Sequence, residues 1–215
     1  VYKRQELQRV ALARGLVLNP LIMILDEPTA SVDQSLRSSM VRRIAHLHRE
    51  TGITFIMATH DFSEALALGT CGAVMRNGVI QQTGSMDEIF YRPTSPFLAS
   101  FVGMRNIYPA DFLDGIAVSG SLEIVHTGSR TGHGFLAVPP EAIVVSRHQV
   151  ETSERNRFRG TISSITRSGR GVDVAVDCSG TIFVAALTRE ALQELGLEEG
   201  TRVFVSFKAN SVHIF

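Results

Sequence analysis

The segment Leu21-Ile22-Met23-Ile24-Leu25-Asp26-Glu27-Pro28-Thr29 joins five apolar residues to two carboxylates and a proline. Uninterrupted apolar runs of this length are typical of strands buried on both faces, as in a parallel sheet. Ligands bind in open α/β sheets at the carboxyl ends of the strands, which is where Asp26 and Glu27 stand. A metal–phosphate site needs such a pair, one carboxylate to hold Mg²⁺ through water and one to orient or deprotonate an attacking water. The alternative is a surface turn after a core strand, and the neighbouring segments favour the site.

Helices and strands are expected to alternate along the first half of the chain. Helical periodicity marks some segments and apolar runs mark others, with caps, prolines and glycines between them. The expected elements are a helix over 6–18, a strand over 21–26, a helix over 34–50, a strand over 53–58, a helix over 61–68 with Asp61 and Glu64 as its capping box, a hairpin over 72–83 that turns at Asn77-Gly78, a capped helix over 85–91 and a helix over 95–102. This order predicts an α/β fold with a parallel sheet, and it places His60 at the same edge as Asp26 and Glu27.

Four segments of this half follow one another in a distinctive order: Glu6–Leu16, the strand ending in Asp26-Glu27, Ala30–Asp33 and Ala58–Asp61. Together they resemble the second half of an ABC-type ATPase domain, over about residues 6–100. The resemblance implies a partial P-loop NTPase parallel sheet that acts with ATP and Mg²⁺.

The same resemblance implies roles for individual side chains. Asp26 matches the Walker B aspartate, which would hold Mg²⁺ through water, and Glu27 matches the catalytic glutamate. His60 matches the switch histidine that contacts the γ-phosphate. Further matches to positions that contact the nucleotide are Glu6 and Gln8 in the signature helix and Asp33 in the D-loop.

Two departures from the family pattern limit what this chain is expected to do alone. It has only two lysines, Lys3 and Lys208, and no G-x-x-x-x-G-K-[ST] loop to cradle phosphates. Tyr-Lys-Arg-Gln at residues 2–5 stands where relatives carry Leu-Ser-Gly-Gly. Either the signature is degenerate or residues 1–5 are not native. We therefore expect the C-terminal portion of a longer ATPase, inactive by itself.

The texture of the sequence changes near residue 104, where we place a domain boundary between residues 1–104 and 105–215. Beyond it, short β-type runs separated by glycines predict a small OB-like β-barrel. Residues 153–160 and 200–212 resemble the molybdate/tungstate-binding "mop" type of accessory (TOBE) barrel, and the resemblance is clearest over 153–215. Since mop sites are shared between modules, a single copy would need a partner chain.

Side chains at the start and end of this barrel could hold a tetrahedral oxyanion. Such an ion is bound by backbone N–H groups, hydroxyls and positive charge. The candidate ligands are Ser153, Arg155, Asn156, Lys208 and Ser211. The alternative is a purely structural barrel that pairs two ATPase subunits.

Composition narrows the range of partners. The chain has 21 basic and 21 acidic residues, so nothing in its charge predicts a nucleic-acid partner. Cys71 and Cys178 stand far apart in the sequence, which suggests neither a disulfide nor a metal site. We predict an ATP-hydrolysing ABC importer subunit, peripheral at the cytoplasmic face of the membrane, with permease subunits and a second ATPase subunit as partners and molybdate or tungstate as cargo. The alternatives are a non-catalytic oxyanion-binding regulator and an importer ATPase for sulfate, ferric iron or polyamines.

Overall fold

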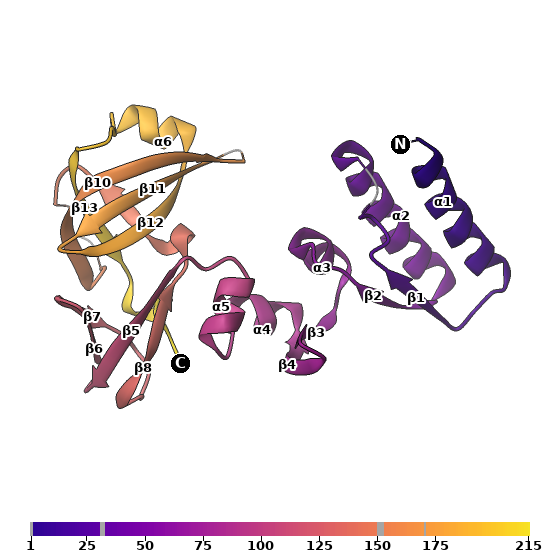
Figure 1. Cartoon of the computed structure of the whole chain (residues 1–215), viewed down its shortest axis with the longest axis horizontal. Coiled ribbons are helices and arrows are strands. Elements are labelled where there is room, and N and C mark those ends of the chain that lie inside the picture. The colour runs from indigo at the N-terminus through magenta and orange to yellow at the C-terminus, as the bar shows by residue number, and fades with distance from the viewer. Residues whose placement is uncertain (1, 31–32, 150–152, 170) are drawn as a thin grey trace. The chain divides into compact units, whose positions relative to one another are not determined.

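The computed structural model describes residues 2–30, 33–149, 153–169 and 171–215 (Figure 1). The chain forms two compact units, Val1–Ile89 and Phe90–Phe215. The elements of the first unit are α1 (Tyr2–Val17), β1 (Ile22–Asp26), α2 (Gln34–Thr51), β2 (Thr54–Ala58), α3 (Phe62–Leu68), β3 (Cys71–Arg76), β4 (Val79–Ser85) and the start of α4 (Met86–Tyr91). The predicted order of helices and strands in this half is confirmed.

The parallel pairing of β1 with β2 sets the geometry of the first unit. Their register runs from Ile22 opposite Thr54 to Asp26 opposite Ala58, so both strands end side by side. Loops that follow the two strands therefore start from one edge, as the sequence predicts.

The expectation that β1 is buried on both faces is wrong. Met23 is buried and faces α1, where Gly15 leaves room for its side chain. Ile22 and Ile24 are 57% and 75% exposed, and Ile56, opposite Ile24, is 54% exposed. In the described part of the chain β1 and β2 pair only with each other, and the face that bears these isoleucines is left uncovered.

Local turn and cap chemistry behaves as the sequence predicts in the second part of this unit. Asn77 and Gly78 both have positive φ (51° and 77°), which a type I′ hairpin turn between β3 and β4 requires. At the start of α4 the Ser85 amide donates to the Glu88 carboxylate (2.8 Å) and the Glu88 amide donates to the Ser85 hydroxyl (3.2 Å). This is the predicted capping box.

The second unit is built mainly of strands. Its elements are α5 (Pro96–Phe101), β5 (Asn106–Leu113), β6 (Ile116–Ser119), β7 (Leu122–Val125), β8 (Gly132–Val138), η1 (Pro140–Ala142), β9 (Val144–Ser146), β10 (Asn156–Ser168), β11 (Gly171–Cys178), β12 (Thr181–Thr188), α6 (Arg189–Glu194), β13 (Arg202–Phe207), η2 (Ala209–Ser211) and β14 (His213–Ile214). The described strands form two five-stranded sheets, β14-β8-β5-β6-β7 and β12-β11-β10-β13-β9. The sequence did not predict β5, β6, β7 or β14.

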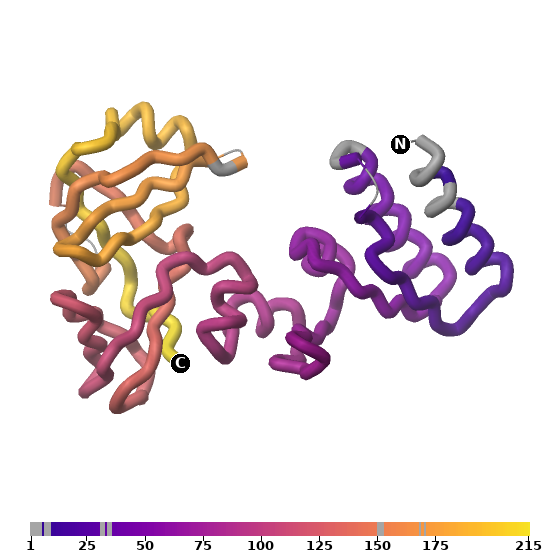
Figure 2. The backbone as a smooth tube through the Cα atoms, in the orientation of Figure 1, coloured from indigo at the N-terminus to yellow at the C-terminus, as the bar shows by residue number. Residues whose placement is uncertain are grey.

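The two sheets contain the same arrangement of strands twice. In each, three strands form a meander (β5-β6-β7 and β10-β11-β12), a fourth returns beside the first (β8 and β13), and a 3₁₀ turn leads to a short last strand. That last strand crosses to the other sheet, so β9 pairs with β13 and β14 pairs with β8. Figure 2 shows the C-terminal segment, in yellow, running from one sheet to the other. The expectation of a single copy is therefore wrong, because residues 106–146 form a second repeat.

A shared core and two buried asparagines join the repeats. Apolar side chains from both sheets form one cluster that includes Phe183 and Phe207, both fully buried. Asn106, at the start of β5, accepts from the Val184 amide (2.6 Å) and donates to the carbonyls of Val184 (2.9 Å) and Val138 (3.0 Å). Asn156 stands at the matching start of β10. It accepts from the amide of Val125 (2.7 Å) and donates to its carbonyl (2.9 Å).

The two cysteines lie in different units and environments. Cys71 begins β3 and is exposed, whereas Cys178 ends β11 and is buried. Burial, reinforced by the charge of Asp177, raises the pKa of the Cys178 thiol to about 12. Cys178 is therefore an unreactive core residue at neutral pH.

Candidate functional site at the edge of the parallel strands

Glu27 and His60 meet at the shared end of β1 and β2. The Glu27 amide donates to the Ala58 carbonyl (2.9 Å), which extends the strand pairing by one residue. His60 lies two residues beyond Ala58, and its Nδ1 is 2.9 Å from Glu27 Oε1. An ionised carboxylate only accepts hydrogen bonds, so Nδ1 donates and Nε2 is the ring nitrogen available to a ligand. The side chains of His60 and Glu27 are 74% and 48% exposed, so both can be reached from solvent.

Asp26 is the last residue of β1 and is exposed beside this pair. The described residues contain no group of three or more His, Cys, Asp or Glu side chains that could hold a metal ion. Mg²⁺ in phosphate-transfer sites is held by one or two carboxylates together with water and substrate phosphates. A single carboxylate at Asp26 fits that mode of binding and does not fit an all-protein metal cage.

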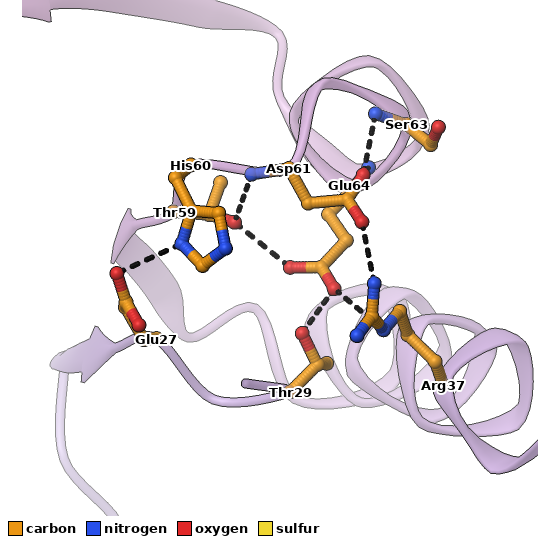
Figure 3. A network of polar contacts seen from close by, with 8 residues as sticks. All are labelled: Glu27, Thr29, Arg37, Thr59, His60, Asp61, Ser63 and Glu64. Atoms are coloured by element: carbon orange, nitrogen blue, oxygen red, sulfur yellow. Dashed lines mark hydrogen bonds and ion pairs between the residues drawn. The ribbon is translucent and has the colours of Figure 1, made fainter. Parts of the chain in front are cut away.

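A buried carboxylate lies directly behind the pair (Figure 3). Glu64, in α3, is 2% exposed. Its Oε1 accepts from the Thr29 hydroxyl and its Oε2 accepts from the Thr59 hydroxyl (2.9 Å). Arg37, from α2, places Nε 3.7 Å from Glu64 Oε1 and donates through Nη1 to Asp61 (2.7 Å). One carboxylate thus connects the two loops with α2 and α3.

Asp61 caps α3 as the sequence predicts, but the predicted capping box does not form. The Asp61 carboxylate accepts from the amides of Ser63 (2.9 Å) and Glu64 (3.4 Å). The Asp61 amide donates to the Thr59 hydroxyl (3.0 Å), while the Glu64 side chain turns to Thr29 and Thr59. Burial on its own would raise the pKa of Asp61. The hydrogen bonds from Glu64, Ser63 and Arg37 outweigh it, and the pKa of Asp61 is lowered.

The structure brings together only part of the predicted nucleotide site. An open pocket at this edge is lined by the catalytic pair and the residues around Glu64. Asp33 is exposed just before α2, and Glu6 is exposed on α1; neither lines that pocket. Gln8 lies within α1, but its side chain is outside the described residues, as are Ser31 and Val32 of the D-loop.

Sequence reasoning missed Thr29, Arg37 and Thr59 as parts of this site. A usable signal existed, since a threonine follows the end of each parallel strand within three residues. Arg37 carried no comparable signal, because arginines on α2 are also expected on its solvent-exposed faces.

The candidate oxyanion ligands of the second unit gather at one end of the β10–β13 pair. Asn156 pairs with Phe207 across these antiparallel strands, so Arg155 and Lys208 stand next to one another in the register. The amide of Ser211 donates to the Lys208 carbonyl (3.1 Å). Ser153, Arg155 and Lys208 are exposed.

Two side chains at this end are already engaged. Asn156 is 1% exposed and bound to Val125, and Glu154 accepts from the Ser206 hydroxyl (2.6 Å). The exposed cations Arg155 and Lys208 are therefore the groups most open to an anion.

Comparisons with known proteins agree with both halves of the sequence interpretation. Residues 152–214 match the family model of the TOBE domain. The chain is 36% identical over 210 residues to the molybdate/tungstate import ATP-binding protein WtpC of Pyrococcus horikoshii, covering 98% of this chain and 61% of the relative. It is 38% identical over 189 residues to the Fe(3+) ions import ATP-binding protein FbpC 1 of Pectobacterium atrosepticum, covering 86% of this chain and 52% of the relative.

A solved structure, that of the cytoplasmic molybdate-binding protein ModG with molybdate bound, aligns with 52% of this chain and 96% of its own at 18% identity and a TM-score of 0.47. None of the described helices is both long and apolar enough to cross a membrane. The chain spans 61% and 52% of the length of the two curated relatives named above. The predicted resemblance is confirmed: the chain is homologous to the ATP-binding subunits of ABC importers and carries a TOBE domain over residues 152–214.

Proposed function

We propose that this chain is the C-terminal portion of an ATP-hydrolysing ABC importer subunit, with Glu27 as its catalytic carboxylate. The observation that carries the proposal is the 2.9 Å contact between Glu27 and His60 at the shared edge of two parallel strands. Residues 1–104 would supply one part of a P-loop NTPase sheet and residues 105–215 its accessory barrel.

The residues of this chain would act in distinct ways. Glu27, as an ionised carboxylate, would orient the attacking water and accept its proton. His60 would fix the Glu27 carboxylate through Nδ1 and present Nε2 to the γ-phosphate. Asp26 would hold Mg²⁺ through water, and Glu6, Gln8 and Asp33 would contact nucleotide. Bound MgATP would supply the phosphoryl group.

The proposed setting of the subunit comes from its relatives. A second copy of the subunit and transmembrane permease subunits would be its partners, and it would work at the cytoplasmic face of the membrane. Molybdate or tungstate is the proposed cargo, supported by the printed name of the Pyrococcus relative and by the cationic end of the β10–β13 pair. Ferric iron is the main rival, because the Pectobacterium relative is equally similar; sulfate and polyamines remain alternatives.

ATP hydrolysis tests the enzymatic part of this proposal. We expect Mg²⁺-dependent phosphate release from the intact subunit and none from the 215-residue chain alone. Turnover by the chain alone that depends on Glu27 would show that the missing phosphate loop is not needed. No turnover by the intact subunit with its permease partners would contradict the proposal.

A second candidate function is an oxyanion sensor, favoured by Arg155 and Lys208 at adjacent positions. Isothermal calorimetry of the chain with molybdate, tungstate and sulfate tests it. We expect micromolar binding of molybdate or tungstate that weakens at least tenfold in Lys208→Ala. The matched control Lys3→Ala, in the other unit, should bind like wild type. No heat with any anion would leave a structural barrel.

A further inference from the structure

We infer that Glu64 is a positioning residue that holds the Glu27–His60 pair in its productive geometry. The inference rests on the proposed function, since it assigns a role within that same site. Glu64 touches neither member of the pair in the contacts described above. It acts on them through Thr29, two residues after Glu27, and Thr59, the neighbour of His60.

The placement of the two hydroxyls makes Glu64 a bridge between the loops. Thr29 follows β1 and Thr59 follows β2, and each donates to a different oxygen of one carboxylate (Figure 3). The strand pairing itself ends at the bond from the Glu27 amide to the Ala58 carbonyl. Beyond that bond the Glu64 carboxylate connects the two loops.

The backbone of Glu27 gives this bridge its importance. Glu27 has φ = 41°, a left-handed conformation that is unfavourable for a residue with a side chain. Such conformations persist where the surroundings hold them, and they cluster at functional sites. The Glu64–Thr29 contact anchors the loop two residues beyond this point, and the Ala30 amide donates to the Glu27 carbonyl (3.2 Å).

Burial of the carboxylate points in the same direction. A carboxylate that is 2% exposed is costly unless charged and hydrogen-bonding groups compensate it. Arg37 and the two threonines provide that compensation, and Arg37 also holds Asp61. An N-cap needs only Asp61, so helix capping does not account for a buried acid at position 64.

Nuclear magnetic resonance of His60 in the 215-residue chain tests the inference, with the ring nitrogens labelled with ¹⁵N. The Nδ1 shift reports whether this nitrogen carries a proton donated to Glu27. Glu27→Gln serves as the reference for a changed contact. We expect Glu64→Ala to move the His60 signals by at least as much as Glu27→Gln moves them. Glu64→Gln, which keeps one acceptor for a hydroxyl, should produce less than half of that change.

Glu88→Ala is the matched control, because Glu88 is also an acid three residues after a helix N-cap and bonds to Ser85. It should lower the melting temperature of the first unit without moving His60. Thr59→Val removes one hydroxyl from the bridge at almost constant volume and should move His60 in the same direction as Glu64→Ala. This variant decides the matter if Glu64→Ala fails to fold.

The outcomes separate this inference from the proposed function. Unchanged His60 signals in Thr59→Val and in folded Glu64 variants would overturn the positioning role, whatever their effect on stability. Unchanged His60 signals in Glu27→Gln would instead remove the contact on which the proposed function rests. A shift in all three bridge variants, with none in Glu88→Ala, supports the assignment.

Discussion

Glu27→Gln in the intact subunit is expected to lower the rate of ATP hydrolysis by about 10²–10⁴-fold, the usual contribution of a positioned general base. Glutamine has almost the same shape, and its amide oxygen can still accept from His60 Nδ1. It cannot take up a proton, so the loss should fall on kcat and leave the Kd for ATP nearly unchanged. Steady-state phosphate release and equilibrium nucleotide binding measure the two quantities.

The surface of α2 offers a matched control for this experiment. Glu50 lies 3.2 Å from His46 in an exposed carboxylate–histidine pair that is remote in sequence from both strand ends. Glu50→Gln should hydrolyse ATP at the wild-type rate. A Glu27→Gln protein that keeps more than a tenth of wild-type turnover would remove Glu27 from the catalytic role.

Asn106→Ala is expected to destabilise the second unit by about 3–5 kcal/mol. The side chain is fully buried and makes three hydrogen bonds to the backbone of Val138 and Val184. Truncation leaves buried polar groups unsatisfied, at about 1–3 kcal/mol each. Asn156→Ala should cost less, about 2–3 kcal/mol, because Asn156 binds the backbone of Val125 only. Urea unfolding followed by circular dichroism measures both.

Asn210→Ala is the control for these variants, since Asn210 is exposed in the short turn η2. Its effect should stay within about 0.5 kcal/mol. A cost for Asn106→Ala as small as that of Asn210→Ala would show that the cross-sheet contacts do not hold the repeats together. A larger cost for Asn156→Ala than for Asn106→Ala would reverse the predicted ranking.

The sequence was most informative where structure is local. Helix periods, caps and the Asn77-Gly78 turn predicted the first unit, because each depends on residues close in the chain. The position of His60 beside Glu27 followed from one further rule, that parallel strands end at the same edge. These features, and not composition, carried the candidate site.

The failures all depend on neighbours that are distant in sequence. Pro109 within β5 argues against a strand, and β9 and β14 are too short to leave a pattern. The apolar run in β1 reflects the character of its side chains and does not reveal which of them are covered. Glu64 has the spacing of a local cap, yet a hydroxyl 35 residues away competes successfully for its carboxylate.

The exchange of last strands makes the second unit topologically inseparable. Strand β14, at the C-terminus, completes the sheet of the first repeat, and β9 completes that of the second. Neither repeat could unfold, be excised or drift apart in structure without opening an edge in the other. The two halves of this unit therefore form one cooperative folding block, and an event at the cationic end of the second repeat is mechanically coupled to the first.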